Sequence, residues 1–86
     1  MPYAAYEAGM IDAAQIRAAR GLLDWKLTDL AEQSGVSLAS LKNIEGGKGN
    51  PRASTLLAIR QAFERAGVQI VEMGDSRPGG RGVRWA

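Results

Sequence analysis

Cysteine and histidine are both absent from this sequence of 86 residues. Without cysteine the chain can form neither a disulfide nor a thiolate metal site, which fits a reducing cytoplasm. Without histidine it lacks the commonest general base and metal ligand in proteins. We therefore expect no metal site and no other cofactor.

Clustered acidic residues are absent as well. The nine Asp and Glu residues are spread along the chain, and no pair of them converges convincingly on a cleft. The sequence also lacks a glycine-rich phosphate loop between a strand and a helix, and the nucleophilic serine turn of hydrolases. With no acid–base pair and no activated nucleophile, we expect that the protein is not an enzyme.

Long apolar runs are missing too. No segment approaches the roughly 20 apolar residues needed to cross a bilayer, so we expect no contact with a membrane. The opening segment MPYAAYEAGM contains neither a basic residue nor the apolar core of a secretory signal. These features predict a cytoplasmic protein, and a chain of this length predicts a single domain.

Positive charge is unevenly distributed, although the formal net charge is only +2. Between residues 42 and 60, four basic residues oppose a single acid, Glu45. Such local patches are typical of proteins that bind polyanions, whereas a solvated basic surface without a partner is the alternative. Near the end of the chain, Arg77 and Arg81 could contact DNA, an acidic partner or nothing, and the sequence gives no reason to choose.

Apolar residues at helical spacing predict the first two helices. Residues 1–11 show no period and are expected to form a flexible arm. Asp12 is a suitable N-cap for a helix over residues 12–24. A second helix is predicted over residues 28–34, and Gly35 supplies the left-handed conformation that ends it.

Two further helices follow. Ser37 caps a short helix that runs to Glu45. A loop with three glycines and a proline separates it from a fourth helix over residues 55–66, for which Ser54 is the expected cap. Gly67 is the predicted stop of this helix.

After Gly67 the pattern changes from helical to β. The segment VQIVEM is β-branched and apolar, GDSRPGGRG is rich in turn residues, and VRW resumes an apolar pattern. We therefore predict a mostly α fold, in which a four-helix domain over residues 12–67 is followed by a C-terminal β-hairpin over residues 68–86.

Residues 15–67 resemble the DNA-binding domain of the Cro/phage-repressor family, the lambda-repressor-like or XRE-type helix-turn-helix regulators. The resemblance lies in QIRAARGLLDW, LAEQSGVSLASLKNIEGGKGNP and TLLAIRQAFERAG, which follow the family's order and spacing. Ala31 is small where the two central helices cross, and Gly35 occupies the turn between them. Apolar residues behind the second of these helices fill the core: Val36, Leu41 and Ile44.

The resemblance implies that the helix ending at Glu45 lies in the major groove of double-stranded DNA. Asn43 can pair with adenine, and Lys42 can donate to guanine or to a phosphate. Apolar side chains on the same face can pack on thymine methyl groups, although an exposed leucine is also common on any surface. The expected base contacts are Ser37, Leu38, Ala39, Lys42 and Asn43.

The resemblance further implies phosphate contacts from the loop after the recognition helix and from neighbouring helices. It also implies an ion pair between Arg20 and Glu45, which ties the first helix to the end of the recognition helix. One departure concerns the second helix, because Leu27 stands where the family commonly has a glutamine that supports a phosphate contact. The expected phosphate contacts are Arg17, Lys26, Thr28, Ser40, Lys48, Asn50 and Arg52.

The C-terminal hairpin is a second departure, since many relatives continue with a fifth helix instead. A two-stranded hairpin is marginally stable alone and leaves an edge open for pairing. Because members of the resembling family generally act as symmetric dimers, we expect the hairpin to join two copies. The alternative is that it folds back over its own helices. The expected dimer contacts are Val68, Ile70, Val71, Val83 and Trp85.

These features together predict a nucleoid-associated homodimer that binds an inverted-repeat operator and regulates transcription, with no small-molecule ligand. Repression and activation both stay open, as does a further partner such as RNA polymerase or another regulatory protein. The alternative function is an antitoxin-like or antiactivator-like module whose main partner is a protein. An acidic recognition face would favour that alternative, and this face has no acid before Glu45.

Overall fold

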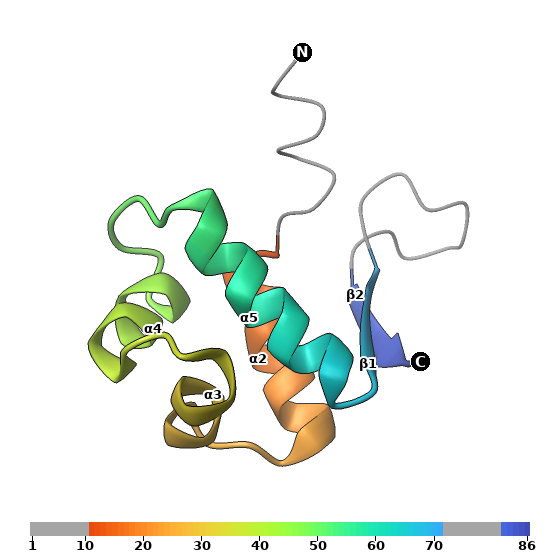
Figure 1. Ribbon diagram of the computed structural model, residues 1–86. Helices are drawn as coiled ribbons and strands as arrows, with labels where there is room; N and C mark the ends of the chain where they lie inside the picture. Colours follow the sequence, from red (N-terminus) through yellow and green to blue (C-terminus); the bar gives the residue numbers. More distant parts are fainter. Residues whose placement is uncertain (1–10, 72–81) are drawn as a thin grey trace.

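The computed structural model describes residues 11–71 and 82–86 (Figure 1). The order of the elements confirms the predicted four helices followed by an antiparallel hairpin. The predictions for the arm before Ile11, and for Arg77 and Arg81, lie outside the described residues. The elements are α2 (Ala13–Leu23), α3 (Leu27–Ser34), α4 (Leu38–Glu45), α5 (Ala53–Arg65), β1 (Val68–Val71) and β2 (Gly82–Trp85).

Helix α2 begins with a reciprocal cap. The Asp12 carboxylate accepts a hydrogen bond from the Gln15 backbone N–H at 2.8 Å, and the Gln15 side-chain oxygen accepts one from the Asp12 N–H at 3.0 Å. Both bonds satisfy N–H groups that have no partner inside the helix. The helix ends at Asp24, which adopts a left-handed conformation with a φ of 56°. Aspartate tolerates this conformation better than most residues do.

Gly35 makes the turn between α3 and α4 possible. Its φ of 77° lies in the left-handed region, where a side chain would be strained. Helix α3 begins at Leu27, one residue earlier than predicted, because the half-buried Leu27 packs against the core. Helix α4 begins after Ser37, as its capping serine predicts.

Helix α5 does not begin where we expected it to. Ser54 was the predicted cap, but the helix starts at Ala53, and Arg52 is its N-cap residue without a side-chain capping bond. The Leu56 N–H already donates to the Arg52 carbonyl at 3.1 Å, so the first turn closes directly after Pro51. Packing explains the early start, because Leu56 is buried and this turn carries it into the core.

The core draws on every helix and on β1. Ile11, expected in the flexible arm, is only 3% exposed and belongs to this core. Trp25, between α2 and α3, stacks on Phe63 of α5 with ring centroids 5.7 Å apart. The largest fully buried side chains are Phe63, Ile16, Leu30, Leu41, Ile59 and Val68.

The hairpin is part of the same core. Strand β1 packs on α5 and β2 packs on α2, so that α2 and α5 stand between the hairpin and α4 (Figure 1). Val68 and Ile70 face the helices and are 0% and 3% exposed, respectively. We expected both to contact a second copy, but the protein's own helices already cover them. Among the proposed dimer contacts, Trp85 is the exposed one.

Gln15 joins this hairpin to α2. Its side chain is 3% exposed, and its amide nitrogen lies 2.8 Å from the Val71 carbonyl and 3.2 Å from the Gly82 carbonyl. Val71 and Gly82 face each other in the hairpin register, so one amide reaches both strands. The buried Gln15 side chain thus forms hydrogen bonds with both strands and with the start of α2, and these bonds stabilise the position of the hairpin on the helix.

The change Gln15→Leu tests this link. Leucine is similar in size to glutamine but has no donor for the two carbonyls. We therefore expect urea denaturation to show that the free energy of unfolding falls by about 1–3 kcal/mol. Gln61→Leu on the exposed face of α5 is the matched control and should alter stability by less than about 0.5 kcal/mol. Equal effects of the two changes would contradict a role for Gln15 in holding the hairpin.

Candidate nucleic-acid interface

One side of α4 is available to a partner. Ala39, Lys42 and Asn43 are exposed, whereas Leu41 and Ile44 on the other side are buried. The eight-residue helix therefore separates its faces as its apolar spacing predicts. This exposed side offers one methyl group, one ammonium and one amide, which suits a groove that presents both polar and apolar groups.

The start of α4 is organised by its cap. The Ser37 hydroxyl accepts from the Ser40 N–H at 3.2 Å and donates to the Ser40 hydroxyl at 3.0 Å. Both serines are exposed, and their hydroxyl groups are already engaged with each other. Leu38, expected to be exposed, is half-buried and leaves only part of its surface for a partner.

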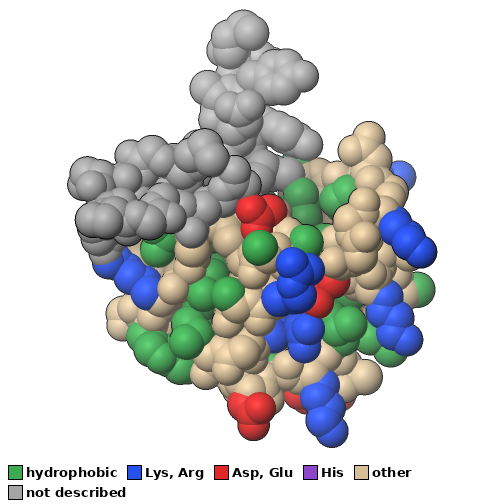
Figure 2. Space-filling view, turned by 180° about the vertical axis from the view of Figure 1, so that it is seen from behind, with side chains coloured by type: hydrophobic (Ala, Val, Ile, Leu, Met, Phe, Trp, Pro, Cys, Tyr) green, Lys and Arg blue, Asp and Glu red, His purple; other side chains and the backbone are tan. Residues whose placement is uncertain are grey.

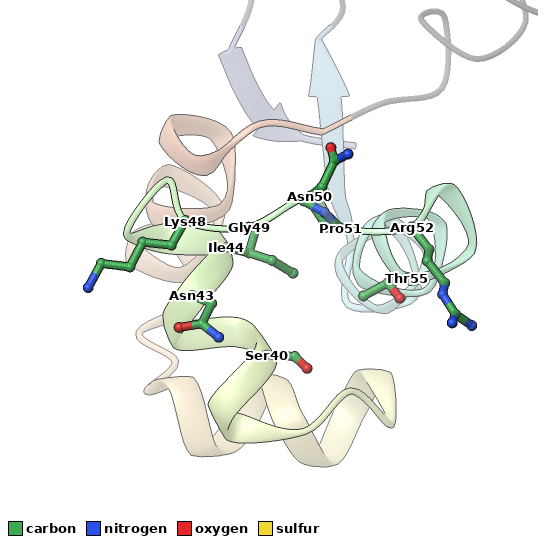
Figure 3. A pocket seen from close by; sticks show the side chains of 9 residues that line it. All are labelled: Ser40, Asn43, Ile44, Lys48, Gly49, Asn50, Pro51, Arg52 and Thr55. Atoms are coloured by element: carbon green, nitrogen blue, oxygen red, sulfur yellow. The ribbon is translucent and has the colours of Figure 1, made fainter.

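A hollow of about 340 Å³ lies between α4 and the start of α5. Ser40 and Asn43 border it from α4, and Arg52 and Thr55 border it from α5 (Figure 3). The rest of its wall is the loop Lys48–Pro51 with Ile44. In Figure 3 the Lys48 side chain extends on the α4 side of the loop and Arg52 on the α5 side. The structure thus brings together four predicted phosphate contacts, Ser40, Lys48, Asn50 and Arg52, and one predicted base contact, Asn43.

The first turn of α5 adds hydrogen-bond donors to this hollow. No acidic residue lies in that turn, and no side chain within the described part of the chain caps its free N–H groups. The partial positive charge at the N-terminus of α5 therefore lies beside Arg52, and helix N-termini of this kind can bind anions. Thr55 was not among the predicted site residues, because its role depends on where α5 begins.

The start of α3 holds two other predicted phosphate contacts, Lys26 and Thr28, which are both exposed. The Lys26 backbone N–H donates to the Asp29 carboxylate at 2.8 Å. This bond does not involve the Lys26 ammonium group. Leu27 between them packs against the core and offers no polar group to a phosphate. The contact that a glutamine would support is therefore not available at Leu27.

Two arginines of α2 reach the last residue of α4. Arg20 forms an ion pair with the Glu45 carboxylate through two bonds, Nε to Oε2 at 2.7 Å and Nη2 to Oε1 at 2.9 Å. Arg20 also donates to the Trp25 carbonyl at 3.0 Å. Arg17, which is also a predicted phosphate contact, donates to the Glu45 backbone carbonyl at 3.0 Å. No sequence motif indicated this last bond.

Basic side chains gather around this surface. Seen from behind, most of the visible Lys and Arg atoms lie on the half of the molecule away from the hairpin (Figure 2). Lys42, Lys48 and Arg52 are all exposed, and none of them forms an ion pair with an acidic side chain of the described residues. Among the described residues, no group of three acidic side chains is placed to hold a metal ion.

The exposed helix, its glycine turn and the basic hollow beside it define the chain as a helix-turn-helix DNA-binding protein. A helix-turn-helix family model matches residues 16–67, so the chain belongs to this family of Cro/C1-type, XRE-like regulators. A comparison with curated proteins gave no match. None of the helices within residues 11–71 is both long enough and apolar enough to span a membrane.

The ion pair between Arg20 and Glu45 can be tested with a matched pair on α5. We expect Glu45→Gln to lower the free energy of unfolding by about 1–3 kcal/mol, because both side chains are largely buried and Arg20 would lose its counter-charge. Glu64→Gln breaks the pair between Arg60 and Glu64, in which the glutamate side chain is 43% exposed, and should cost less than about 0.5 kcal/mol. Chemical denaturation at neutral pH measures both, and similar small losses would contradict the structural role of Glu45.

Proposed function

We propose that the protein is a sequence-specific transcriptional regulator that places α4 in the major groove of double-stranded DNA. The observation that carries this proposal is the exposed side of α4 next to a basic hollow at the start of α5. A duplex offers the complementary features, base edges in the groove and phosphates along its rim.

Base recognition falls to the exposed side of α4. Asn43 can form two hydrogen bonds with adenine, and Lys42 can donate to the acceptors of guanine. Ala39 can contact a thymine methyl group, with the accessible part of Leu38 beside it. The Ser37 hydroxyl contributes a base contact only if it exchanges its bond with Ser40.

Phosphate binding falls to the rim of this surface. Arg52 and the free N–H groups of α5 can hold a phosphate at the hollow, with Thr55 and Asn50 as additional donors. Lys48 can contact a phosphate of the DNA strand on the α4 side, and Ser40 borders the same hollow. Lys26 and Thr28 can reach a further phosphate at the start of α3.

Selection of binding sites from random duplex DNA, followed by footprinting, tests the function. We expect an enriched sequence with two symmetric half-sites, because a two-fold dimer reads the same bases twice. Half-sites of such dimers lie about one helical turn apart. If no sequence is enriched over random DNA, the proposed function is wrong.

Single changes then separate the two kinds of contact. Asn43→Ala should weaken binding to the selected duplex by about 1–3 kcal/mol and relax the base preference at one position in each half-site. Arg52→Met should weaken selected and random duplexes alike and reduce the salt slope by about one unit. Fluorescence anisotropy at several salt concentrations measures both. Identical behaviour of the two variants would contradict the assigned roles.

The proposal includes a homodimer formed through the side of the molecule that carries the hairpin. Leu22 and Trp85 are exposed by 37% and 54%, respectively. Leu22 follows Gln15 by two helical turns, and Trp85 follows Gly82 by a similar length of strand. Because Gln15 binds the Gly82 carbonyl, these equal distances along α2 and β2 bring Leu22 and Trp85 near each other. A second copy there would leave α4 free for DNA, with the half-buried Val71 and Val83 as minor contacts.

Sedimentation of Trp85→Ala tests the dimer. Losing an exposed aromatic contact twice across a two-fold axis should raise the dimer dissociation constant by about tenfold or more. Leu57→Ala is the control, since Leu57 is 47% exposed on α5 and lies outside the proposed contact. Removal of the entire hairpin is unsuitable, because Val68 and Ile70 belong to the core. Unchanged association of Trp85→Ala would rule out this surface.

A further inference from the structure

The C-terminal end of α4 has a partner for each of its last four carbonyl groups. A helix usually leaves these groups to water or to a capping motif. The fourth, the Glu45 carbonyl, accepts from Arg17 Nη1 of α2 at 3.0 Å. The other three accept from backbone N–H groups of the following loop: Gly46 to Lys42 at 3.0 Å, Gly47 to Ile44 at 3.1 Å and Lys48 to Asn43 at 2.8 Å.

Arg17 and Arg20 lie three residues apart on α2 and both hold Glu45. Arg20 takes the carboxylate and Arg17 takes the backbone carbonyl. The carboxylate bond can be kept while the helix axis tilts, because several rotatable bonds of the glutamate separate it from the backbone. The bond of Arg17 acts on the helix backbone itself, so it constrains the direction of α4 more closely.

We propose that Arg17 is a positioning residue for sequence recognition, rather than a phosphate contact. Its bond to the Glu45 carbonyl sets the angle at which α4 lies in the groove. This inference rests on the proposed function, in which α4 reads base edges. An eight-residue helix is too short to hold its form or direction by itself, so its contacts with α2 and α3 decide both.

The distinction has a physical consequence for binding. Paired hydrogen bonds to a base edge require placement within about 0.5 Å, so a small rotation of α4 weakens them. Contacts of flexible lysine and arginine side chains with phosphates tolerate such a rotation. Loss of Arg17 should therefore reduce the preference for the selected sequence and leave binding to random DNA nearly unchanged.

The test compares Arg17→Met with two arginine controls in the full chain. Methionine keeps an apolar stem but removes the charge and the bond to Glu45. Arg65→Met is the matched control, because Arg65 donates in the same way to the Gln33 carbonyl at 2.7 Å, which belongs to α3 and not to α4. Arg52→Met represents a phosphate contact. Each variant is titrated with the selected duplex and with a scrambled duplex of equal length, at several salt concentrations and well below its melting temperature.

We expect Arg17→Met to lower the ratio of selected to scrambled affinity by about tenfold, with the salt slope on scrambled DNA unchanged. Arg65→Met should keep the ratio. If Arg17→Met weakens both duplexes alike and reduces the salt slope by about one unit, Arg17 is a phosphate contact and the proposal is overturned. An unchanged ratio overturns it as well, because the bond then has no effect on recognition.

Hydrogen exchange without DNA makes the result independent of the proposed function. The N–H groups of Gly47 and Lys48, which close the end of α4, should exchange faster in Arg17→Met than in Arg65→Met. If the wild-type protein shows no preference among duplexes, the proposed function fails while this exchange still reports the role of Arg17 in placing α4. Equal exchange in the two variants would remove the structural basis of the inference.

Discussion

The attachment of α2 to Glu45 is the constraint on which the recognition surface depends. Helix α4 has eight residues, so its own hydrogen bonds cannot fix its direction, which depends on the packing of Leu41 and Ile44 and on bonds to neighbouring helices. The Arg20 ion pair and the Arg17 bond act on the same residue at the end of this helix. Both arginines therefore add to the packing of Leu41 and Ile44 in holding α4, although they lie on another helix.

The hairpin completes the core rather than extending from it. Four short helices enclose a small interior, and a domain of this size buries a limited share of its surface. Val68 and Ile70 add apolar side chains to that interior, and the Gln15 amide holds both strands at 2.8 and 3.2 Å. Since α2 contacts the hairpin on one side and α4 on the other, it connects the proposed dimer surface with the proposed DNA surface.

Much of the site was predictable because local patterns control it. The capping serine at residue 37, the glycine turn at residue 35 and the spacing of Leu41 and Ile44 all act within a few residues, and the exposed Lys42 and Asn43 follow from them. Features that depend on packing were less accessible. Leu38 is half-buried, α5 starts before Ser54, and Arg17 turns toward Glu45, because each is decided by neighbours distant in the sequence.

The sequence by itself determined the class of this protein, through its four helices, its glycine turn and its basic loop. Short-range rules suffice there, because caps, turns and helical spacing involve residues less than two turns apart. Only the tertiary structure decided which apolar residues of the hairpin are covered, and which arginines hold the recognition helix. Those outcomes depend on long-range contacts such as Gln15 with Gly82 and Arg17 with Glu45, which no local pattern encodes.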